Sequence, residues 1–407
     1  MSEHLASSRP ATAPSTGGRR PGTAQLLILL SASCLSVLGA VLIAPVLPQL
    51  KDAFAGVPGA DVLAAVVLTV PALLIGLTAP FAGLIVDKVD RKRLLLIALV
   101  CYAITGTAPL YLPSLPAILI SRVVVGVCEA AIMTCATTLI GDYWSGARRS
   151  RYLSLQTLVA SLSATVFLAL GGALGARSWR TPFWVYAVAL VLVPLTAKLI
   201  WRPDTKAAAG RRLAPLPWRA LLTPYLVTFI GGIVFYTLIV ELSFVLTEAG
   251  LGSTAAIGGI SALMSVATAA GCVVFARLSH RTPRTLLPVA FGLSAIGFAL
   301  VFATGSVPVI SAGAAVAGFG TGMLLPTLLT WAVNGLEFEQ RGRGTGGWTA
   351  ALFIGEFLCP LLIAAIGAGA GGLRPAIGVL GLAAAAMAAL CVVATRRHNP
   401  RLDLTAG

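Results

Sequence analysis

The chain has 407 residues, of which 57% are hydrophobic and 11% are charged, and its mean hydropathy is +0.93. Soluble globular domains contain roughly 45–50% apolar and about 25% charged residues. The composition therefore excludes an ordinary soluble domain and places the chain in a lipid bilayer. The formal net charge of +15 would suit a nucleic-acid partner only if a soluble domain presented a basic face, and we find no such domain in the sequence.

Apolar stretches long enough to cross a membrane fill nearly the whole chain. A spanning helix needs about 20 mostly apolar residues, because the hydrocarbon layer is ~30 Å thick and a helix rises about 1.5 Å per residue. We expect an all-α membrane protein with twelve transmembrane helices, at residues 25–48, 62–86, 94–112, 117–141, 152–176, 181–201, 222–247, 255–276, 286–304, 307–333, 344–369 and 373–395.

The longest gap between these stretches is basic and divides them six and six, which predicts two pseudo-symmetric six-helix bundles. The first residues are rich in Ser, Pro, Ala, Thr and Gly, a composition that cannot bury a core. We therefore expect a disordered cytoplasmic tail at 1–24, a first bundle at 25–201, a cytoplasmic linker at 202–221, a second bundle at 222–396 and a cytoplasmic tail at 397–407.

Lys and Arg gather in alternate connections between the spans. With the amino terminus inside, the outer connections hold few of the 29 Lys and Arg, and Arg122 falls within a span; the outer ones are Lys51, Arg177, Arg180 and Arg374. Cytoplasmic loops of membrane proteins are enriched in Lys and Arg. We expect a multi-pass protein of the cell (inner) membrane with both termini cytoplasmic.

Several chemistries find no support in the sequence. The histidines, His4, His280 and His398, lie in loops or tails, which argues against a metal site or a histidine-based catalytic arrangement. No GxxxxGK[ST] phosphate loop occurs, so we expect no direct use of ATP. The cysteines lie within spans and form no CxxC, so we expect packing residues and no disulfides. We predict neither an enzyme nor a cofactor-dependent protein.

Four charged side chains fall inside predicted spans and away from their ends: Arg122, Glu129, Glu241 and Glu356. A charge within hydrocarbon costs about 2.5–3.5 kcal/mol on insertion scales, so such residues are functional candidates. Arg122 and Glu129 are seven residues apart, which places them on one helix face about 10.5 Å apart along the axis. Arg122 lies near the outer end, where a side chain that reaches the membrane surface is the alternative interpretation.

Glu129 and Glu356 lie near the middle of their spans, whereas Glu241 lies nearer the outside. Burial in an apolar cavity raises the pKa of a carboxyl group, which suits it to proton uptake and release near neutral pH. We predict a proton-coupling or substrate-binding role for all four charged residues, with structural hydrogen bonds as the alternative for Glu356 and Glu241. Aromatic neighbours that could line a cavity are Tyr236, Phe353 and Phe357.

Closely spaced glycines recur in two spans. Gly318 and Gly322 form GxxxG in the tenth span, and Gly171, Gly172 and Gly175 end the fifth. Small residues let helix backbones approach closely in lipid. Ordinary tight packing explains such spacing, and an interface between the two moving halves is the more specific alternative for the fifth span.

A charged motif lies between the second and third spans, with members Gly83, Asp87, Lys88, Asp90, Arg91 and Lys92. A weaker copy follows the eighth span, where Arg281 and Arg284 repeat the spacing of Lys88 and Arg91. The motif resembles GxxxD[RK]xG[RK][RK] of the major facilitator superfamily, with Asp90 where that pattern has glycine. Arg122-Val-Val-Val-Gly126 is similar to the fourth-helix arginine motif of the same superfamily.

The resemblance implies the major facilitator fold, with two halves that alternately expose a central cavity. It also implies that the loop motif latches the halves on the cytoplasmic side. Asp87 would lie near a helix N-terminus, where partial positive charge favours a carboxylate. Arg91 and Lys92 would pair with acids or with carbonyls of a last helical turn, and Asp142 is a candidate partner.

Ala44-Pro-Val-Leu-Pro48 is similar to twelve-helix drug:proton antiporters, although the fifth span lacks their Gly-Pro. We therefore predict secondary export of small organic molecules or drugs, powered by the proton gradient, by a monomer surrounded by lipid. Proton-coupled uptake of a small metabolite is the nearest alternative. A membrane sensor without transport is a more distant one, because the sequence offers no signalling domain.

Overall fold

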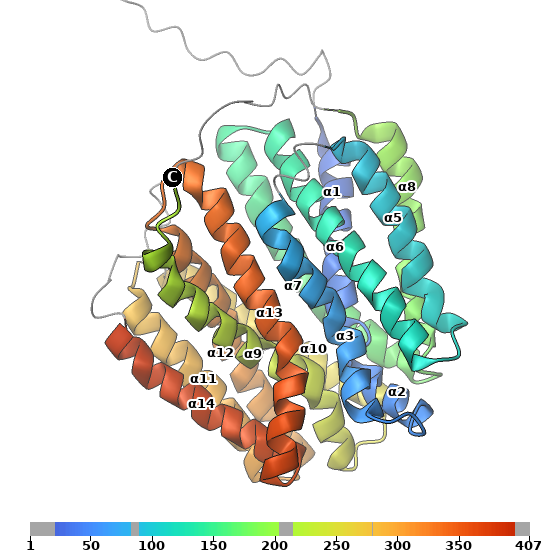
Figure 1. The fold of residues 1–407 in the computed structure, drawn as a ribbon, viewed down its shortest axis with the longest axis vertical. Helices are drawn as coiled ribbons and strands as arrows, with labels where there is room; N and C mark the ends of the chain where they lie inside the picture. The colour runs from blue at the N-terminus through green and yellow to red at the C-terminus, as the bar shows by residue number, and fades with distance from the viewer. Residues whose placement is uncertain (1–20, 83–88, 203–214, 279, 395–407) are drawn as a thin grey trace, which may run out of the picture.

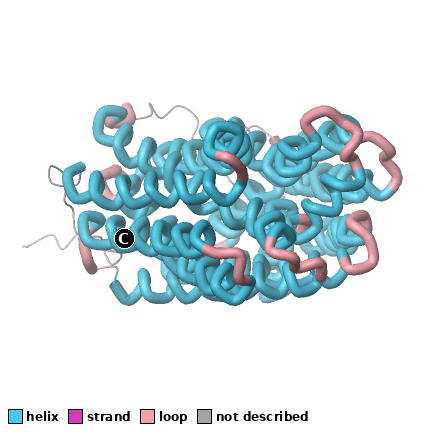
Figure 2. Tube along the Cα trace, turned by 90° about the horizontal axis from the view of Figure 1, so that it is seen from below, coloured by secondary structure: helices cyan, strands magenta, loops and turns pink. Residues whose placement is uncertain are grey.

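The computed structural model describes residues 21–82, 89–202, 215–278 and 280–394. Seen from below in Figure 2, this part of the chain consists of helices joined by loops, with no strand. Within it, twelve helical segments are long and apolar enough to cross a membrane. The number of spans agrees with the number expected from the sequence.

The first half of the chain supplies six of these segments. It consists of α1 (Thr23–Val41), η1 (Ala44–Val46), α2 (Leu47–Ala53), α3 (Ala60–Thr78), η2 (Ala79–Phe81), α5 (Arg91–Thr107), η3 (Ala108–Leu110), α6 (Leu115–Tyr143), α7 (Gly146–Gly175), η4 (Thr181–Ala187) and α8 (Val188–Leu199). The second half consists of α9 (Trp218–Glu248), α10 (Thr254–Leu278), α11 (Pro283–Ala303), α12 (Val307–Val333), α13 (Phe338–Ala370) and α14 (Leu373–Ala394).

Prolines set the breaks within the spans of the first half. Each described 3-10 turn has a proline at its second residue, namely Pro45, Pro80, Pro109 and Pro182. Proline has no backbone N–H to continue the α-helical ladder, and its ring disfavours the α conformation of the preceding residue. The first span accordingly leaves the α-helix after Val41 and resumes it in α2.

The two halves lie side by side, with the first half on the right of Figure 1 and the second on the left. Their most extensive contacts are those of α3 with α13 and of α7 with α10, and α2 and η1 add smaller contacts with α9 and α10. The fifth span therefore meets the other half, as the specific interpretation of its glycines requires. Gly318 and Gly322 instead pack on Met264 and Thr268 of α10, inside the second half.

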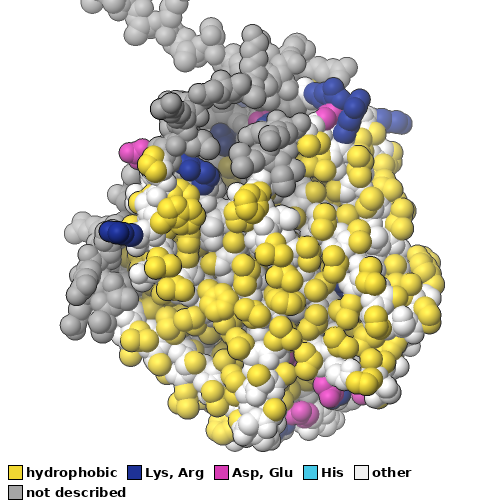
Figure 3. All heavy atoms as spheres, viewed as in Figure 1, with side chains coloured by type: hydrophobic (Ala, Val, Ile, Leu, Met, Phe, Trp, Pro, Cys, Tyr) yellow, Lys and Arg dark blue, Asp and Glu magenta, His cyan; other side chains and the backbone are white. Residues whose placement is uncertain are grey.

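Charge distinguishes the two ends of the bundle. Helix α1 begins and α8 ends at the upper end in Figure 1, which we call the terminal end; the other is the opposite end. Hydrophobic side chains cover the middle of the face shown in Figure 3, and most of its Lys and Arg lie at the terminal end. The surface is that of a helical membrane protein.

Several helices begin before the apolar stretches predicted from the sequence. Helix α7 starts at Gly146 instead of 152, α13 at Phe338 instead of 344, and α9 at Trp218, inside the expected linker 202–221. Hydropathy locates only the part of a helix that needs an apolar surrounding. The first turns of α7 contain Arg148, Arg149 and Arg151, so the helix extends beyond that part.

Candidate functional site

A cavity of about 720 Å³ lies between the two halves. Helices α1, α3, α6 and α7 line it from the first half, and α9 to α13 line it from the second. The lining part of α7 runs from Leu153 to Leu168, and that of α13 runs from Thr345 to Glu356. The cavity therefore occupies the middle of the bundle and reaches toward the terminal end.

The lining is mostly apolar, with many hydroxyl groups and one carboxyl group. Among the described residues that line the cavity, Glu356 is the only Asp, Glu, Lys, Arg or His. Aromatic side chains come from both α9 and α13. The polar lining residues include Ser33, Ser36, Thr137, Gln156, Thr157, Ser161, Ser265, Thr268, Thr321 and Thr345.

The structure separates the aromatic and acidic candidates into two groups. Tyr236, Phe353 and Glu356 line the cavity. Phe357 is half-buried outside its lining, because one further residue turns the side chain by about 100° around the helix from Glu356. Glu241 is buried in α9 and also lies outside the lining, closer to the opposite end.

Gln156, which was not predicted from the sequence, joins three helices on the polar side of the cavity. Its side-chain amide donates to the hydroxyl of Ser33 at 2.7 Å and to that of Thr137 at 3.1 Å. These bonds join α7 to α1 and α6. The signal was present, because α7 carries several Ser, Thr and Gln residues inside a stretch that is otherwise apolar.

Glu129 lies outside the cavity lining, buried inside the first half at 1% exposure. Its carboxyl group packs directly on α1 at Gly39. A Cβ placed on Gly39 would lie 2.7 Å from the carboxyl carbon and closer still to one oxygen. Within the described part of the chain, neither oxygen of this carboxyl has a hydrogen-bond partner.

Arg122 is equally buried, so it does not extend to the membrane surface. Its guanidinium group donates to the carbonyl oxygens of Thr105 at 3.1 Å and Gly106 at 3.0 Å, at the end of α5. The group also lies 5.3 Å from the ring centre of Phe183 and 4.8 Å from that of Tyr186, within cation–π range.

No ion pair or hydrogen bond joins Arg122 to Glu129 within the described residues. Because about two helical turns separate the two residues along α6, their side chains contact different neighbours. Arg122 therefore holds the end of α5 against η4.

Glycine contacts close the bundle beyond the cavity, toward the opposite end. A Cβ on Gly172 of α7 would lie 2.6 Å from the Cα of Gly258 of α10 and 2.7 Å from the carbonyl oxygen of Thr254. The side-chain amide of Gln49 donates to the carbonyl of Gly175 and to the hydroxyl of Thr254. We call the contacts that Gly172 and Gln49 make with Thr254 and Gly258 of α10 the seam.

A central cavity between two halves, closed at one end, is typical of a transporter that works by alternating access. The model of the Major Facilitator Superfamily matches residues 29–287 and 225–406. The chain belongs to the major facilitator superfamily. It is therefore a multi-pass membrane transporter, and its twelve spans form the major facilitator fold.

Two relatives carry names that refer to different compounds. The 3-(3-hydroxy-phenyl)propionate transporter of Escherichia coli is 28% identical over 323 residues, which cover 74% of this chain and 78% of the relative. Quinolone resistance protein NorA of Staphylococcus aureus is 24% identical over 214 residues, which cover 51% of this chain and 54% of that protein.

Solved structures share the fold at low sequence identity. A bacterial homologue of the human lysosomal transporter Spinster aligns with a TM-score of 0.77 and 18% identity, covering 93% of this chain and 98% of that chain. The D-xylose-proton symporter aligns with a TM-score of 0.74 and 16% identity, covering 94% and 98%.

The superfamily loop motif is described from Asp90 onward; Gly83, Asp87 and Lys88 lie outside the described residues. Arg91 forms an ion pair with Asp142 at the end of α6, so the partner expected from the sequence is in place. The ammonium group of Lys92 donates to the carbonyl oxygen of Ala197 in α8 at 2.7 Å. Both of these contacts lie inside the first half.

Asp90, which departs from the superfamily pattern, has two roles of its own. Its carboxyl group accepts hydrogen bonds from the backbone N–H groups of Lys92 and Arg93, which makes it the N-cap of α5. The same carboxyl forms an ion pair with Arg202, just beyond α8. An aspartate at this position therefore fixes the start of α5 and ties it to the end of α8.

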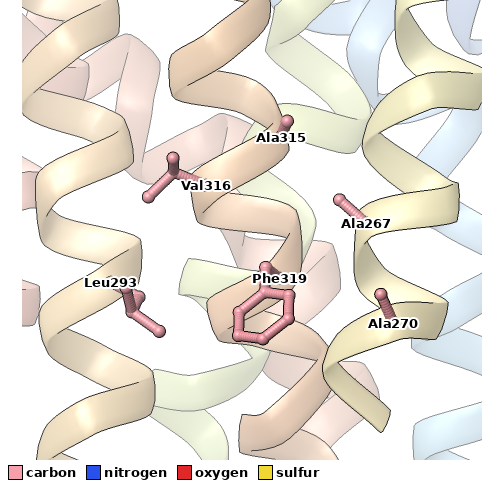
Figure 4. Close-up of a pocket in the computed structure, with 6 residues that line it drawn as sticks. All are labelled: Ala267, Ala270, Leu293, Ala315, Val316 and Phe319. Atoms are coloured by element: carbon pink, nitrogen blue, oxygen red, sulfur yellow. The ribbon is translucent and has the colours of Figure 1, made fainter. Parts of the chain in front are cut away.

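A smaller hollow of about 350 Å³ lies among α10, α11 and α12, away from the central cavity (Figure 4). Its described lining is entirely apolar and consists of Ala267, Ala270, Leu293, Ala315, Val316 and Phe319. Without a polar group, it cannot orient a polar substrate. The central cavity is the candidate substrate site.

Proposed function

We propose that this transporter exports small neutral or cationic organic molecules in exchange for protons. The observation that carries the proposal is the charge of the central cavity. Its described lining holds one carboxyl group, that of Glu356, and no Lys, Arg or His. A cation entering such a cavity gains a counter-charge, whereas an anion would leave water without one.

The volume and the apolar lining suit a molecule larger than an ion or a simple sugar. Ligand pockets of about 300–1,000 Å³ with few polar groups are typical for drug-sized molecules. The aromatic rings of Tyr236 and Phe353 offer faces for a flat apolar substrate or an organic cation. Export of such compounds is consistent with quinolone resistance, after which the relative NorA is named.

The Escherichia coli relative suggests a second candidate, a carboxylate substrate such as 3-(3-hydroxy-phenyl)propionate. That compound also fits by size and aromatic character. Its negative charge, however, would face the carboxyl group of Glu356 without a neighbouring cation in the described lining. We therefore favour the neutral or cationic class.

Glu129 supplies the proton-coupling group in this proposal. A buried carboxylate without a partner is costly, and protonation removes the charge. The carboxyl of Glu129 is buried against Gly39 and has no hydrogen-bond partner among the described residues, so this conformation favours its neutral form. Another conformation that gives the group donors or water would release the proton.

The distribution of Lys and Arg sets the proposed orientation. Since cytoplasmic loops are enriched in these residues, the terminal end faces the cytoplasm. The cavity reaches toward that end, and the seam closes the other. The proton gradient is the energy source, the membrane is the inner membrane, and the transporting unit is one chain.

Flux into proteoliposomes tests both direction and substrate charge. The vesicles have an acid lumen and a clamped membrane potential. Ethidium, a fluorescent monocation, or labelled 3-(3-hydroxyphenyl)propionate is added outside, and its uptake is measured. Exchange with protons predicts gradient-driven accumulation of ethidium, whereas symport predicts loss of preloaded compound. The Glu129→Gln variant should lose gradient-driven accumulation and retain exchange of ethidium for ethidium. Faster transport of the anion by the wild-type chain, or ethidium accumulation that ignores the gradient, would contradict the proposal.

A further inference from the structure

The side-chain amide of Gln156 leaves its oxygen free for a partner in the central cavity. Both N–H groups of the amide are used, because they donate to the hydroxyls of Ser33 on α1 and Thr137 on α6. No described residue donates to the amide oxygen, Oε1. This oxygen is also not one of the described buried polar atoms without a partner, so it is accessible, and Gln156 itself lines the cavity. A substrate in the cavity can therefore donate to it.

Ser33 fixes which end of the amide faces away from α1. The Ser33 hydroxyl donates to the carbonyl oxygen of Leu29, one turn earlier in α1, at 2.8 Å. A hydroxyl has a single proton, so its oxygen can then only accept, and it faces the amide nitrogen of Gln156 at 2.7 Å. If the amide were turned around, two oxygen atoms would face each other with no proton between them. The amide is therefore held with its nitrogen toward α1 and its oxygen free.

Most other donors of the cavity lining are also used by the protein itself. The hydroxyl of Tyr236 donates to the carbonyl oxygen of Ala40, and the thiol of Cys272 donates to that of Gly322. Hydroxyls that donate to a carbonyl of their own helix are those of Ser33, Ser36, Thr157, Ser161, Thr268 and Thr321. The oxygen atoms of these groups remain as acceptors.

Three lining hydroxyls are exceptions. Those of Thr137, Ser265 and Thr345 donate to no carbonyl within the described residues, although the first two each accept a hydrogen bond. With the carboxyl group of Glu356 included, the described lining presents more hydrogen-bond acceptors than free donors. Such a lining matches a substrate that brings its own N–H or O–H donors.

We propose that Gln156 is a specificity-determining residue whose amide oxygen accepts a hydrogen bond from an N–H group of the substrate. The preferred substrates are organic cations that carry N–H groups, such as amines, amidines and aromatic amines. Cations whose nitrogen or phosphorus bears only carbon are disfavoured. The inference rests on the proposed transport of neutral or cationic molecules and narrows that class. Glu356 supplies the counter-charge from the second half, and Gln156 recognises the donor from the first.

The amide oxygen distinguishes the two kinds of cation because the cavity replaces water around the substrate. An N–H group that leaves water and finds no acceptor loses the free energy of a hydrogen bond. Gln156 restores that bond, and positive charge on the donor strengthens it. A net hydrogen bond corresponds to roughly threefold to tenfold in affinity. A fully alkylated cation has no N–H group to satisfy, so Gln156 adds nothing to its binding.

Two dyes of similar shape and equal charge test the inference. Rhodamine 6G and tetramethylrhodamine ethyl ester are both monocationic ethyl esters on a xanthylium ring, but only rhodamine 6G has N–H groups. Binding of each dye to the full chain in lipid nanodiscs is followed by fluorescence polarisation, with empty nanodiscs as the blank. The wild-type chain should bind rhodamine 6G more tightly. Gln156→Met should lower the affinity for rhodamine 6G roughly threefold to tenfold and leave that for the methylated dye nearly unchanged.

Gln156→Glu separates recognition of the substrate from a structural role. Like Gln156→Met, it removes the N–H groups that join α7 to α1 and α6. A carboxyl group keeps an accepting oxygen in either protonation state, so the preference for rhodamine 6G should persist. Gln49→Met makes the methionine substitution at the seam, outside the cavity lining, and should shift both affinities equally or not at all.

Equal affinity of the two dyes for the wild-type chain, or an unchanged preference in Gln156→Met, overturns the inference. Equal loss of the preference in Gln156→Met and Gln156→Glu also overturns it, because a structural role would then explain both. These results leave the proposed transport of cations standing. Tighter binding of labelled 3-(3-hydroxyphenyl)propionate than of either dye would instead contradict the proposed function itself, so the two failures are distinguishable.

Discussion

The carboxyl group of Glu129 occupies the space that a side chain at position 39 would fill, because Gly39 of α1 has none. The two residues lie 90 positions apart in the chain. Their contact joins α1 to α6 at the depth of the cavity, and it removes the acid from water. The proton-coupling role proposed for Glu129 therefore depends on a glycine that carries no chemistry of its own.

Gly39→Ala tests this dependence. The added methyl group would overlap the carboxyl of Glu129, and overpacking of this kind costs about 1–3 kcal/mol. We expect a lower melting temperature and a loss of proton-driven transport, measured on the same purified protein. Shortening the acid in Gly39→Ala/Glu129→Asp should restore part of the stability, because the carboxyl then withdraws from the methyl group.

Gly259→Ala serves as the control for Gly39→Ala. Gly259 is an exposed helical glycine with open space where a methyl group would lie, so its substitution should leave both readouts unchanged. If Gly39→Ala keeps full proton-driven transport at wild-type stability, the steric account of Glu129 is wrong.

Substrate charge selection should depend on Glu356 and not on Glu241. Both acids are buried, but only Glu356 lines the cavity. A unit charge at about 6 Å and an effective dielectric constant of ~20 contributes roughly 3 kcal/mol, part of which desolvation offsets. We expect Glu356→Gln to weaken ethidium binding about tenfold.

Glu241→Gln is the matched variant, with the same chemical change outside the cavity lining. Binding of a neutral compound of similar size should be nearly unchanged in both variants. Equal weakening of cation and neutral binding in Glu356→Gln would show that the residue shapes the cavity without selecting charge. Competition of each compound with ethidium fluorescence measures both affinities.

The sequence predicted what depends on local pattern. The stretch expected at 307–333 is helix α12 residue for residue, because a span of apolar residues bounded by Ser306 and Asn334 leaves little choice. Asp142 was a candidate partner of Arg91 because of the resemblance to the superfamily loop motif, and the structure shows that ion pair. Both features depend on the charge and hydropathy of short stretches of the chain, which can be read from the sequence.

What the sequence could not supply was the partner of each buried charge. Arg122 donates to the backbone carbonyl oxygens of Thr105 and Gly106. Every residue has such an oxygen, so the residue types in the sequence do not indicate which ones Arg122 contacts. The place of Gly39 opposite Glu129 depends on how α1 rotates against α6. Both contacts arise from packing between distant segments, so periodicity alone does not specify them.

Asp90 should stabilise α5 through its cap more than through its ion pair. Loss of an N-cap side chain costs about 1 kcal/mol, whereas exposed ion pairs contribute ~0–1 kcal/mol. The side chain of Arg202 is 60% exposed, which places the pair in the weaker class. Asp90→Ala should therefore speed amide exchange in residues 91–95, and Asp90→Asn, which keeps a capping oxygen, should do so far less. Equal exchange in the two variants would contradict the cap.

Closure of the opposite end should depend on the glycine pair in the seam. A methyl group on Gly172 would meet the backbone at Gly258 and Thr254, where no side-chain rotation can relieve the contact. Gly172→Ala should therefore separate α7 from α10 and favour the conformation that is open at the opposite end. Gly258→Ala should act in the same direction from the other helix, because the contact is reciprocal.

Labelling of a cysteine at position 46 reports this opening. Val46 is buried at 1% exposure in η1, which contacts both α9 and α10. In a Val46→Cys background, Gly172→Ala and Gly258→Ala should speed labelling by a membrane-impermeant maleimide, relative to the parent chain with its native cysteines. Gly259→Ala, next to the seam but on the exposed face of α10, should not. Unchanged labelling in a folded Gly172→Ala variant would mean that the seam accommodates the methyl group without exposing position 46. The contact between α7 and α10 would then not control access from the opposite end.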